Sequence, residues 1–186
     1  MRKLVVFSSV SVDGYCAGEG GDISWAHSGD DAEFRAFVEG NASGGGMLVF
    51  GRKTYEMMAG YWPSPMAAAN DPVVAARMNG MQKLVFSRTL AAADWRNTTL
   101  LQDDLVGTIR RLKQEPGEDM CILGSASLVV PLAEAGLVDE FQLVVVPVVL
   151  GGGRTLFEGL REKLPLVLRQ TRAFGNGNVL LCYGQK

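Results

Sequence analysis

Short apolar runs alternate along the chain with segments of helical character. The apolar runs are rich in β-branched residues, which is typical of buried strands, and they occupy residues 3–10, 47–50, 83–86, 98–101, 119–123 and 141–149. The intervening hydrophobic spacing predicts helices over residues 30–39, 53–58, 73–78, 104–113 and 127–135. Because such an alternation requires crossover connections, we expect an α/β fold with a largely parallel sheet covered on both faces.

This rhythm changes at the end of the chain. Two strand-like runs, residues 166–174 and 178–183, follow one another with only the turn sequence Gly175-Asn176-Gly177 between them. We therefore expect a C-terminal antiparallel hairpin that completes the sheet. Residues 60–72 contain three prolines and an alanine run, which predicts a surface excursion that could cover a site.

Length and composition indicate one globular domain, residues 1–186, with 47% hydrophobic and 20% charged residues. The net charge of −2 comes from 18 basic and 20 acidic residues without long blocks of one sign, which argues against a nucleic-acid partner. Three cysteines and a single histidine, His27, do not supply the usual zinc ligands or a disulfide framework. No signal-peptide core or membrane-length apolar run is found, so we expect a cytoplasmic protein.

Three predicted strands end in residues suited to binding phosphate. These strand ends carry Gly51-Arg52-Lys53-Thr54, Ser87-Arg88-Thr89 and Gly124-Ser125-Ala126-Ser127. Glycine allows close backbone approach, hydroxyls and helix-start amides donate hydrogen bonds, and guanidinium groups bind phosphate through paired donors. Each motif alone is also compatible with an ordinary strand-to-helix turn. Their occurrence at three strand ends predicts a site for a nucleotide with several phosphates.

Better-known fingerprints do not fit the sequence. No Gly-x-Gly-x-x-Gly follows a strand, and residues 46–53 do not form a P-loop because a predicted strand lies within them. A Gly-x-Ser-x-Gly motif is also lacking. The sequence therefore disfavours kinases, classical dinucleotide-binding folds and serine hydrolases.

Asp30 is the candidate catalytic residue. It follows Trp25 at the start of a predicted helix, where a carboxylate could anchor the amino group and ring nitrogen of a heterocycle and help to protonate it. The alternative is structural, because Asp30 and Glu33 match a helix capping box. Residues 151–153, three glycines before Arg154, fit equally a phosphate nest or a flexible turn.

Several segments resemble a known family. They are residues 11–15 (Ser-Val-Asp-Gly-Tyr), 48–56, 83–90, 136–141 and 147–157. In this order and spacing they resemble the stand-alone bacterial dihydrofolate reductase family proteins, which are similar to the C-terminal reductase domain of the bifunctional riboflavin-biosynthesis enzyme. The resemblance runs almost from end to end of the chain.

This resemblance implies a three-layer αβα fold of the dihydrofolate-reductase type and NADPH as cofactor. It implies Gly51, Arg52 and Thr54 at the phosphates and Ser87 and Arg88 near the adenosine 2′-phosphate. The residues implied at the pyrophosphate are Gly124, Ser125, Ala126 and Ser127. Residues 11–15, with Asp13 and Tyr15 as candidate substrate-binding residues, would border the nicotinamide and the substrate.

The spacing of Trp25, Asp30 and Phe34 resembles the substrate-binding tryptophan, aspartate and phenylalanine of dihydrofolate reductase itself. The chain departs from the riboflavin-pathway reductases at two positions. It has Leu123 where they tend to carry a glutamate, and Tyr15 where they tend to carry a lysine.

Together these observations predict an NADPH-dependent reductase of a small pterin- or pyrimidine-like substrate. A binding module for a nucleotide or pterin, without turnover, is the alternative on the same fold. A homodimer is also expected, because relatives in the family are commonly dimeric and because residues 143–149 are predicted to supply a sheet edge that needs cover.

Overall fold

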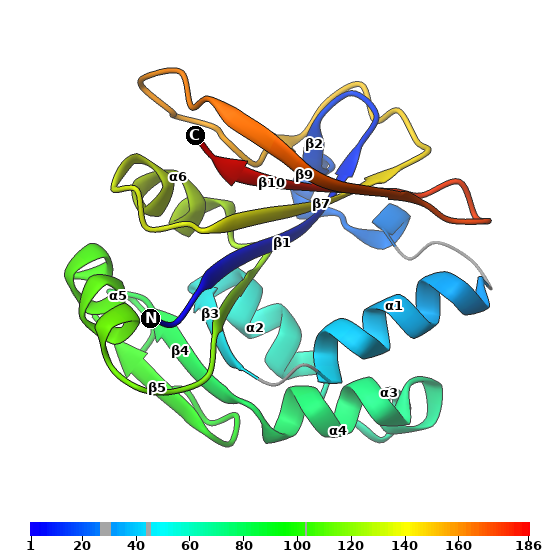
Figure 1. Cartoon of the computed structure of the whole chain (residues 1–186). Coiled ribbons are helices and arrows are strands. Elements are labelled where there is room, and N and C mark those ends of the chain that lie inside the picture. Colours follow the sequence, from blue (N-terminus) through cyan, green and yellow to red (C-terminus); the bar gives the residue numbers. More distant parts are fainter. Residues whose placement is uncertain (27–30, 44–45, 103) are drawn as a thin grey trace.

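A single eight-stranded sheet forms the centre of the molecule (Figure 1). The computed structural model describes residues 1–26, 31–43, 46–102 and 104–186. The strand order is β5-β4-β3-β6-β1-β7-β10-β9, in which the neighbours from β5 to β7 pair in parallel and the pairs β7–β10 and β10–β9 are antiparallel. The strands are β1 (Leu4–Ser11), β3 (Met47–Gly51), β4 (Gln82–Phe86), β5 (Thr98–Leu101), β6 (Met120–Leu123), β7 (Glu140–Val146), β9 (Leu166–Ala173) and β10 (Val179–Gln185). The predicted mostly parallel sheet with a terminal hairpin is confirmed.

Helices cover both faces of this sheet because its central strands are apolar on both sides. In β3, Leu48 and Phe50 belong to one core cluster and Val49 to another. The first cluster includes side chains of α2 (Arg52–Tyr61) and α4 (Pro72–Gly80), and α1 (Ala32–Ser43) packs against it. The second includes side chains of α5 (Leu105–Gln114) and α6 (Ala126–Glu134). These are the three layers of the αβα fold, with α5 and α6 on the left of Figure 1.

The segment predicted as a surface excursion, residues 60–72, is mostly exposed and largely helical. It contains the end of α2, the short helix α3 (Pro65–Asn70) and the start of α4. Ser64 caps α3 by accepting a hydrogen bond from the Ala67 amide at 3.2 Å. Pro65 and Pro72 each stand in the first turn of a helix, where the missing N–H has no helical partner to lose.

The prediction of a sheet edge at residues 143–149 was wrong. The strand β7 ends at Val146 and lies between β1 and β10, so the outer strands are β5 and β9. Neighbours in the sheet depend on long-range pairing, which an apolar run in the sequence does not reveal. A homodimer formed through this part of the sheet must use the outer strand β9 or an exposed face.

A second, two-stranded sheet lies beyond the carboxyl ends of β1 and β7. It pairs β2 (Tyr15–Ala17) with β8 (Arg154–Thr155), and two 3₁₀ turns, Glu19–Gly21 and Ser24–Ala26, follow β2. The approach of the two segments requires Gly153, because a Cβ atom at this position would collide with the Ala17 carbonyl oxygen. Figure 1 shows β2 and the loop after β7 side by side at one end of the sheet.

Among the described residues, no helix combines the length and apolar character needed to cross a bilayer.

Candidate functional site

The candidate site lies where two neighbouring parallel strands send their helices to opposite faces of the sheet. β3 is followed by α2, which packs in one core cluster, and β6 is followed by α6, which packs in the other. Because the two connections diverge, the carboxyl ends of β3 and β6 form a topological switch point, and a crevice is expected there. In open α/β sheets, ligands bind in crevices of this kind.

A hydrogen bond joins the two helix starts across this crevice. The backbone N–H of Gly51 donates to Ser125 Oγ at 3.1 Å, and the pair is buried. A Cβ built on Gly51 would lie 3.2 Å from Ser127 Oγ, so the two chain segments almost touch. Gly124 and Ser125 both have left-handed backbone conformations, with φ of 59° and 44°. The sharp turn that they form lets α6 start directly opposite α2.

Neither of these helix starts is capped by a side chain in the described part of the chain. Gly51 and Ser125 occupy the N-cap positions of α2 and α6 without making a side-chain cap. By contrast, Ser64 caps α3 and Asp104 caps α5. A helix start has backbone N–H groups without helical partners and a positive end of the helix dipole. Two such starts facing one crevice form a favourable environment for an anion.

The strand order brings the three predicted phosphate motifs together. β4, β3 and β6 are adjacent, so Ser87 and Arg88 lie at the end of the strand beside Gly51. Ser87 is buried, and its Oγ accepts hydrogen bonds from the Thr89 and Leu90 amides at 3.2 and 3.0 Å. Arg52 and Arg88 are exposed and Thr54 is half-buried. The motifs thus line one continuous stretch of the sheet's carboxyl edge.

The N-cap of α1 is Asp31, whereas the capping box predicted for Asp30 and Glu33 depends on a residue outside the described part of the chain. The Phe34 amide donates to Asp31 Oδ1 at 2.6 Å, and Glu33 forms an ion pair with Arg172 at 2.6 Å. Either of two adjacent aspartates can satisfy the three-residue capping spacing. Asp30 itself, with His27, lies outside the described residues.

The candidate substrate residues Trp25 and Phe34 pack against the same apolar cluster. This cluster contains Val144 and Val146 of β7 and Phe174 after β9. Phe34 meets the Phe174 ring edge-on, with 5.1 Å between ring centroids. Trp25 is half-buried, and its Nε1 donates to the Asp22 carbonyl at 3.0 Å. The structure therefore places these two aromatic residues on the α1 side of the sheet.

Asp13 is bound by the protein itself. Its carboxylate accepts hydrogen bonds from Ser11 Oγ at 2.6 Å and from the Gly151 amide at 2.7 Å, and the Leu150 amide lies 3.1 Å from Oδ1. These donors, the Ser11 hydroxyl above all, lower the pKa of Asp13 to about 2. Tyr15 is half-buried in β2 and pairs with Thr155.

Sequence reasoning missed the partners of Asp13. Ser11 is buried at the end of β1, and the donors from the glycine-rich loop are backbone amides about 137 residues away. The only local signal was the glycine run, which fitted both a nest and a turn. In the structure, the amides of Leu150 and Gly151 do bind an anion, but this anion is a side chain of the same protein.

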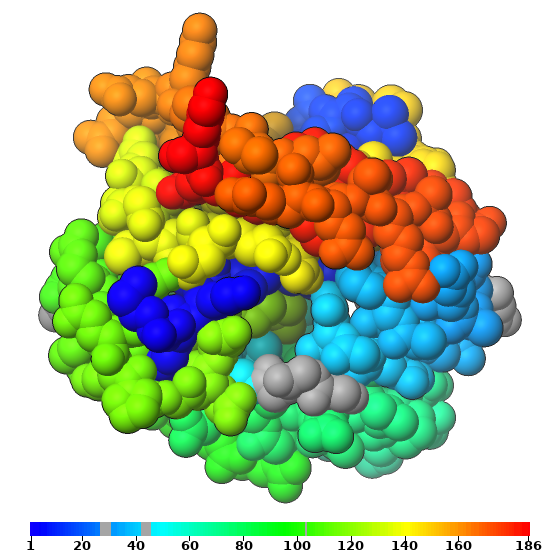
Figure 2. Space-filling view, viewed as in Figure 1, coloured from blue at the N-terminus to red at the C-terminus, as the bar shows by residue number. Residues whose placement is uncertain are grey.

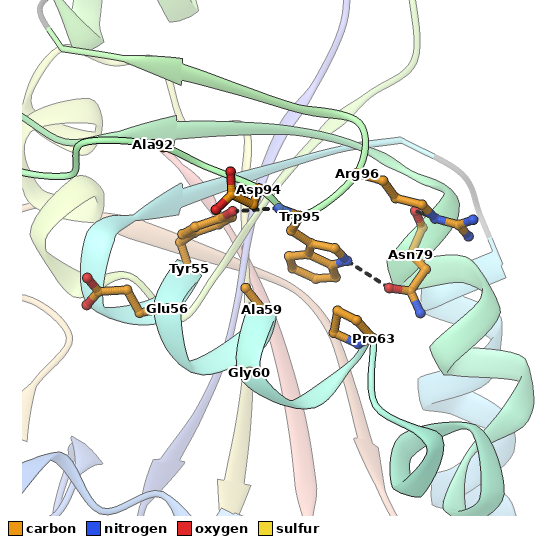
Figure 3. A pocket seen from close by; sticks show the side chains of 10 residues that line it. All are labelled: Tyr55, Glu56, Ala59, Gly60, Pro63, Asn79, Ala92, Asp94, Trp95 and Arg96. Carbon is orange, nitrogen blue, oxygen red and sulfur yellow. Dashed lines mark hydrogen bonds between the residues drawn. The ribbon is translucent and has the colours of Figure 1, made fainter.

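A separate cavity of about 750 Å³ lies between α2 and the loop before β5 (Figure 3). Its polar groups are largely paired with one another. The Trp95 amide donates to Tyr55 Oη at 3.0 Å and the Trp95 indole donates to Asn79 Oδ1 at 2.7 Å. Behind the indole, Lys83 is buried 4.3 Å from the ring centroid, and burial is the main reason its pKa falls to about 8. These bonds hold the loop before β5 against α2 and α4. None of the three phosphate motifs lines this cavity.

The described side chains contain no group of three histidine, cysteine or acidic residues arranged to hold a metal ion.

Comparisons with known proteins identify the family to which the chain belongs. The family model of the RibD C-terminal domain matches residues 2–180. The uncharacterized protein YyaP of Bacillus subtilis (strain 168) is 30% identical over 182 residues, which cover 98% of this chain and 94% of YyaP.

Two solved structures share the fold. A putative riboflavin biosynthesis protein from Shewanella sp. PV-4 superposes with a TM-score of 0.76 at 22% identity, covering 100% of this chain and 99% of that one. A diaminohydroxyphosphoribosylaminopyrimidine deaminase/5-amino-6-(5-phosphoribosylamino)uracil reductase from Thermotoga maritima superposes with a TM-score of 0.71 at 14% identity. In that case the match covers 100% of this chain and 57% of the longer Thermotoga chain.

Proposed function

Because this chain belongs to the RibD C-terminal domain family, we propose that it is an NADPH-dependent reductase of a small pterin- or pyrimidine-like heterocycle. The observation that carries the proposal is the meeting of two uncapped helix starts, α2 and α6, joined by the bond between the Gly51 amide and Ser125 Oγ. A dinucleotide with a pyrophosphate group satisfies the backbone donors of both helices at once.

The backbone at Gly124 is open to a ligand. A Cβ added to Gly124 would meet no described atom within 4 Å, so a phosphate could approach the backbone here. Gly51, Arg52 and Thr54 at α2 and residues 124–127 at α6 are the groups that would hold the phosphates. Arg52 and Arg88 are exposed cations at neighbouring strand ends, and charge-assisted bonds from them would select the additional 2′-phosphate of NADPH.

NADPH, when bound, supplies the hydride. The residues of the protein would orient the substrate and protonate it. Trp25 and Phe34 offer aromatic surface on the α1 side of the sheet against which a flat ring can pack. The Asp30 carboxyl group would accept a hydrogen bond from the amino group of that ring through one oxygen and, when protonated, donate its own proton from the other oxygen to the ring nitrogen.

The first prediction concerns Gly124, for which Gly136 is a matched control. Both have left-handed backbones, with φ of 59° and 66°, and a Cβ at either meets no described atom within 4 Å. They lie before the start and after the end of α6. Either alanine variant should lose about 1–2 kcal/mol of unfolding free energy. Only Gly124→Ala should weaken NADPH binding, by about tenfold or more, in titration calorimetry. Equal affinity in the two variants would place the pyrophosphate elsewhere.

The second prediction concerns cofactor choice. Arg88→Ala should weaken NADPH by roughly 1.5–3 kcal/mol, the range for hydrogen bonds to charged groups, and should leave NADH binding nearly unchanged. Arg77→Ala is the control, because Arg77 is exposed in the last turn of α4, before β4 begins. Calorimetric titrations of each variant with NADPH and with NADH measure the two affinities. Equal losses for NADPH and NADH in Arg88→Ala would contradict the assignment.

The third prediction separates an enzyme from a binding module. NADPH oxidation should first be screened with a panel of pterins and pyrimidines. Asp30→Asn should then lower turnover by about 10²-fold or more with little change in melting temperature. The neighbouring variant Asp31→Asn loses the same charge but retains a good N-cap residue, so its turnover should stay near that of the wild type.

Unchanged turnover in Asp30→Asn would refute the role of Asp30. A protein that binds NADPH tightly but oxidises it with no member of the panel would favour the alternative of a binding module.

A homodimer is the remaining proposal, now based on the exposed end of the sheet. β9 is an outer strand, exposed from Leu168 to Ala173, and Figure 2 shows its orange residues crossing the surface of the molecule. Next to it, Leu143 of β7 pairs with Leu181 of β10, and Val145 pairs with Val179. All four side chains are only half-buried. A second copy laid on this apolar face would complete their burial.

The fourth prediction is that the wild type is a dimer by light scattering and that Leu181→Glu is a monomer. Val73→Glu is the control, because Val73 is an exposed valine on α4, away from this face. It should remain dimeric. A wild-type monomer at micromolar concentration would end the proposal.

A further inference from the structure

We propose that Asp13 is a positioning residue that locks the glycine-rich loop, residues 150–153, onto the loop after β1, residues 12–15. It does so by placing its own carboxylate in the anion-binding position formed by the backbone amides of the glycine-rich loop. The lock would hold these two loops as one wall of the site. The effect of this lock on catalysis rests on the proposed reductase function. The existence of the lock does not depend on that function.

The carboxylate of Asp13 collects its donors from both loops. Leu150 N lies 3.1 Å from Oδ1 and 3.2 Å from Oδ2, and Gly151 N lies 2.7 Å from Oδ2. From its own side, Ser11 Oγ donates to Oδ1 at 2.6 Å. The Ser11 hydroxyl also accepts the Tyr15 amide at 2.9 Å. The carboxylate therefore connects the backbone of the glycine-rich loop with the turn that carries Tyr15.

Contacts on either side of Asp13 restrict the two loops to one relative position. Before it, the Val12 amide donates to the Val148 carbonyl at 2.9 Å. After it, β2 pairs with β8, and Cys16 Sγ donates to the Arg154 carbonyl at 3.3 Å. Between these two attachments the carboxylate is the group that binds residues 150 and 151. Removing it should free the middle of the glycine-rich loop while both ends stay attached.

The chemistry at this position is that of an anion nest. Gly151 has a positive φ of 72°, and the amides of residues 150 and 151 both point to one carboxylate. Successive amides in such a turn bind anions well, and hydrogen bonds to a charged acceptor are stronger than neutral ones. Because Asp13 occupies the nest, the glycine-rich loop is not where a cofactor phosphate binds. The loop instead serves as a rigid wall.

This wall stands beside the proposed substrate residues. β1 and β7 are adjacent parallel strands, so the two loops continue the sheet's carboxyl edge next to β6 and the cofactor crevice. The lock fixes Tyr15, whose amide is bound to Ser11. Loss of the lock should therefore affect the use of the substrate more than the binding of NADPH.

The decisive measurement is amide hydrogen exchange at Leu150 and Gly151 in the full chain, by NMR and without cofactor. In Asp13→Ala, exchange at these two amides should accelerate by about tenfold or more, as expected for the loss of hydrogen bonds to a charged acceptor. Asp13→Asn retains one carbonyl oxygen but no charge, and should give a smaller acceleration. Wild-type exchange rates in Asp13→Ala would overturn the proposal.

Asp22→Ala is the matched control. Asp22 also accepts a backbone amide, that of Ser24 at 2.9 Å, but it does so within its own turn. This variant loses an acidic cap without separating two loops, so exchange at Leu150 and Gly151 should stay as in the wild type. Acceleration there as large as in Asp13→Ala would overturn the proposal, because the effect would not be specific to the lock.

Chemical rescue tests whether the nest recognises an anion. Formate added to Asp13→Ala should enter the vacated position and slow the exchange of both amides, whereas formamide, which has the same shape but no charge, should not. Rescue by formate alone supports the assignment. Equal effects of the two compounds, or none from formate, would refute the anion nest.

Kinetics then connect the lock with the reaction. With a substrate identified in the panel, Asp13→Ala should lower kcat/KM for that substrate by about tenfold or more, while the Kd for NADPH stays within about twofold of the wild-type value. A loss of NADPH affinity as large as the loss in kcat/KM would contradict the assignment of these two loops to the substrate side of the site. If the wild type oxidises NADPH with no substrate, the reductase proposal fails, and the exchange and rescue results still decide whether the lock exists.

Discussion

The backbone N–H groups at the starts of α2 and α6 impose the main constraint on this structure. Peptide donors at a helix start need partners. α1, α3 and α5 obtain them from Asp31, Ser64 and Asp104, whereas α4, like α2 and α6, has no side-chain cap. α2 and α6 follow adjacent strands but turn to opposite faces of the sheet, so their starts share one crevice. The Gly51 amide is satisfied across it by Ser125 Oγ. The fold thus leaves a cluster of donors at one point, and an anionic ligand is their natural partner.

The strand order divides the site into two halves. β4, β3 and β6 carry the phosphate motifs, whereas β1 and β7 carry the loops joined by Asp13. The halves meet where Leu123 pairs with Phe7 and where the Gly124 amide donates to the Phe7 carbonyl at 3.0 Å. Because the left-handed turn at Gly124 belongs to both halves, this backbone hydrogen bond, together with side-chain packing between α6 and β1, sets the position of α6 relative to β1. A cofactor held by one half would therefore lie in a defined position against a substrate held by the other.

Much of this arrangement could be predicted from local patterns, and the failures have physical reasons. Parallel strands place their carboxyl ends on one edge, so motifs at Gly51, Ser87 and Gly124 were predicted to lie together before the strand order was known. Asp31 caps α1, a role that the sequence could not assign uniquely because two adjacent aspartates both fit the capping spacing. β2 and β8 contain three and two residues, too few to show a hydrophobic period. The place of β7 inside the sheet depends on pairing with β10, which no local pattern encodes.

Two positions near the candidate site, Leu123 and Tyr15, differ from the pattern of riboflavin-pathway reductases, and both lack the charge that those enzymes tend to carry there. Leu123, where those enzymes tend to carry a glutamate, packs against the apolar cluster of Leu48, Phe50 and Trp95. A carboxylate in that position would lose hydration without gaining a partner from these side chains. Tyr15, where they tend to carry a lysine, is half-buried in β2.

Both changes replace a charge by an apolar or aromatic group, and Trp25 and Phe34 add further aromatic surface on the α1 side. A phosphoribosyl group needs cations to bind it, whereas a flat ring needs aromatic surface and a carboxylate to hold its amino group. For the proposed reductase, these differences would favour a planar heterocycle over a substrate that carries a sugar phosphate.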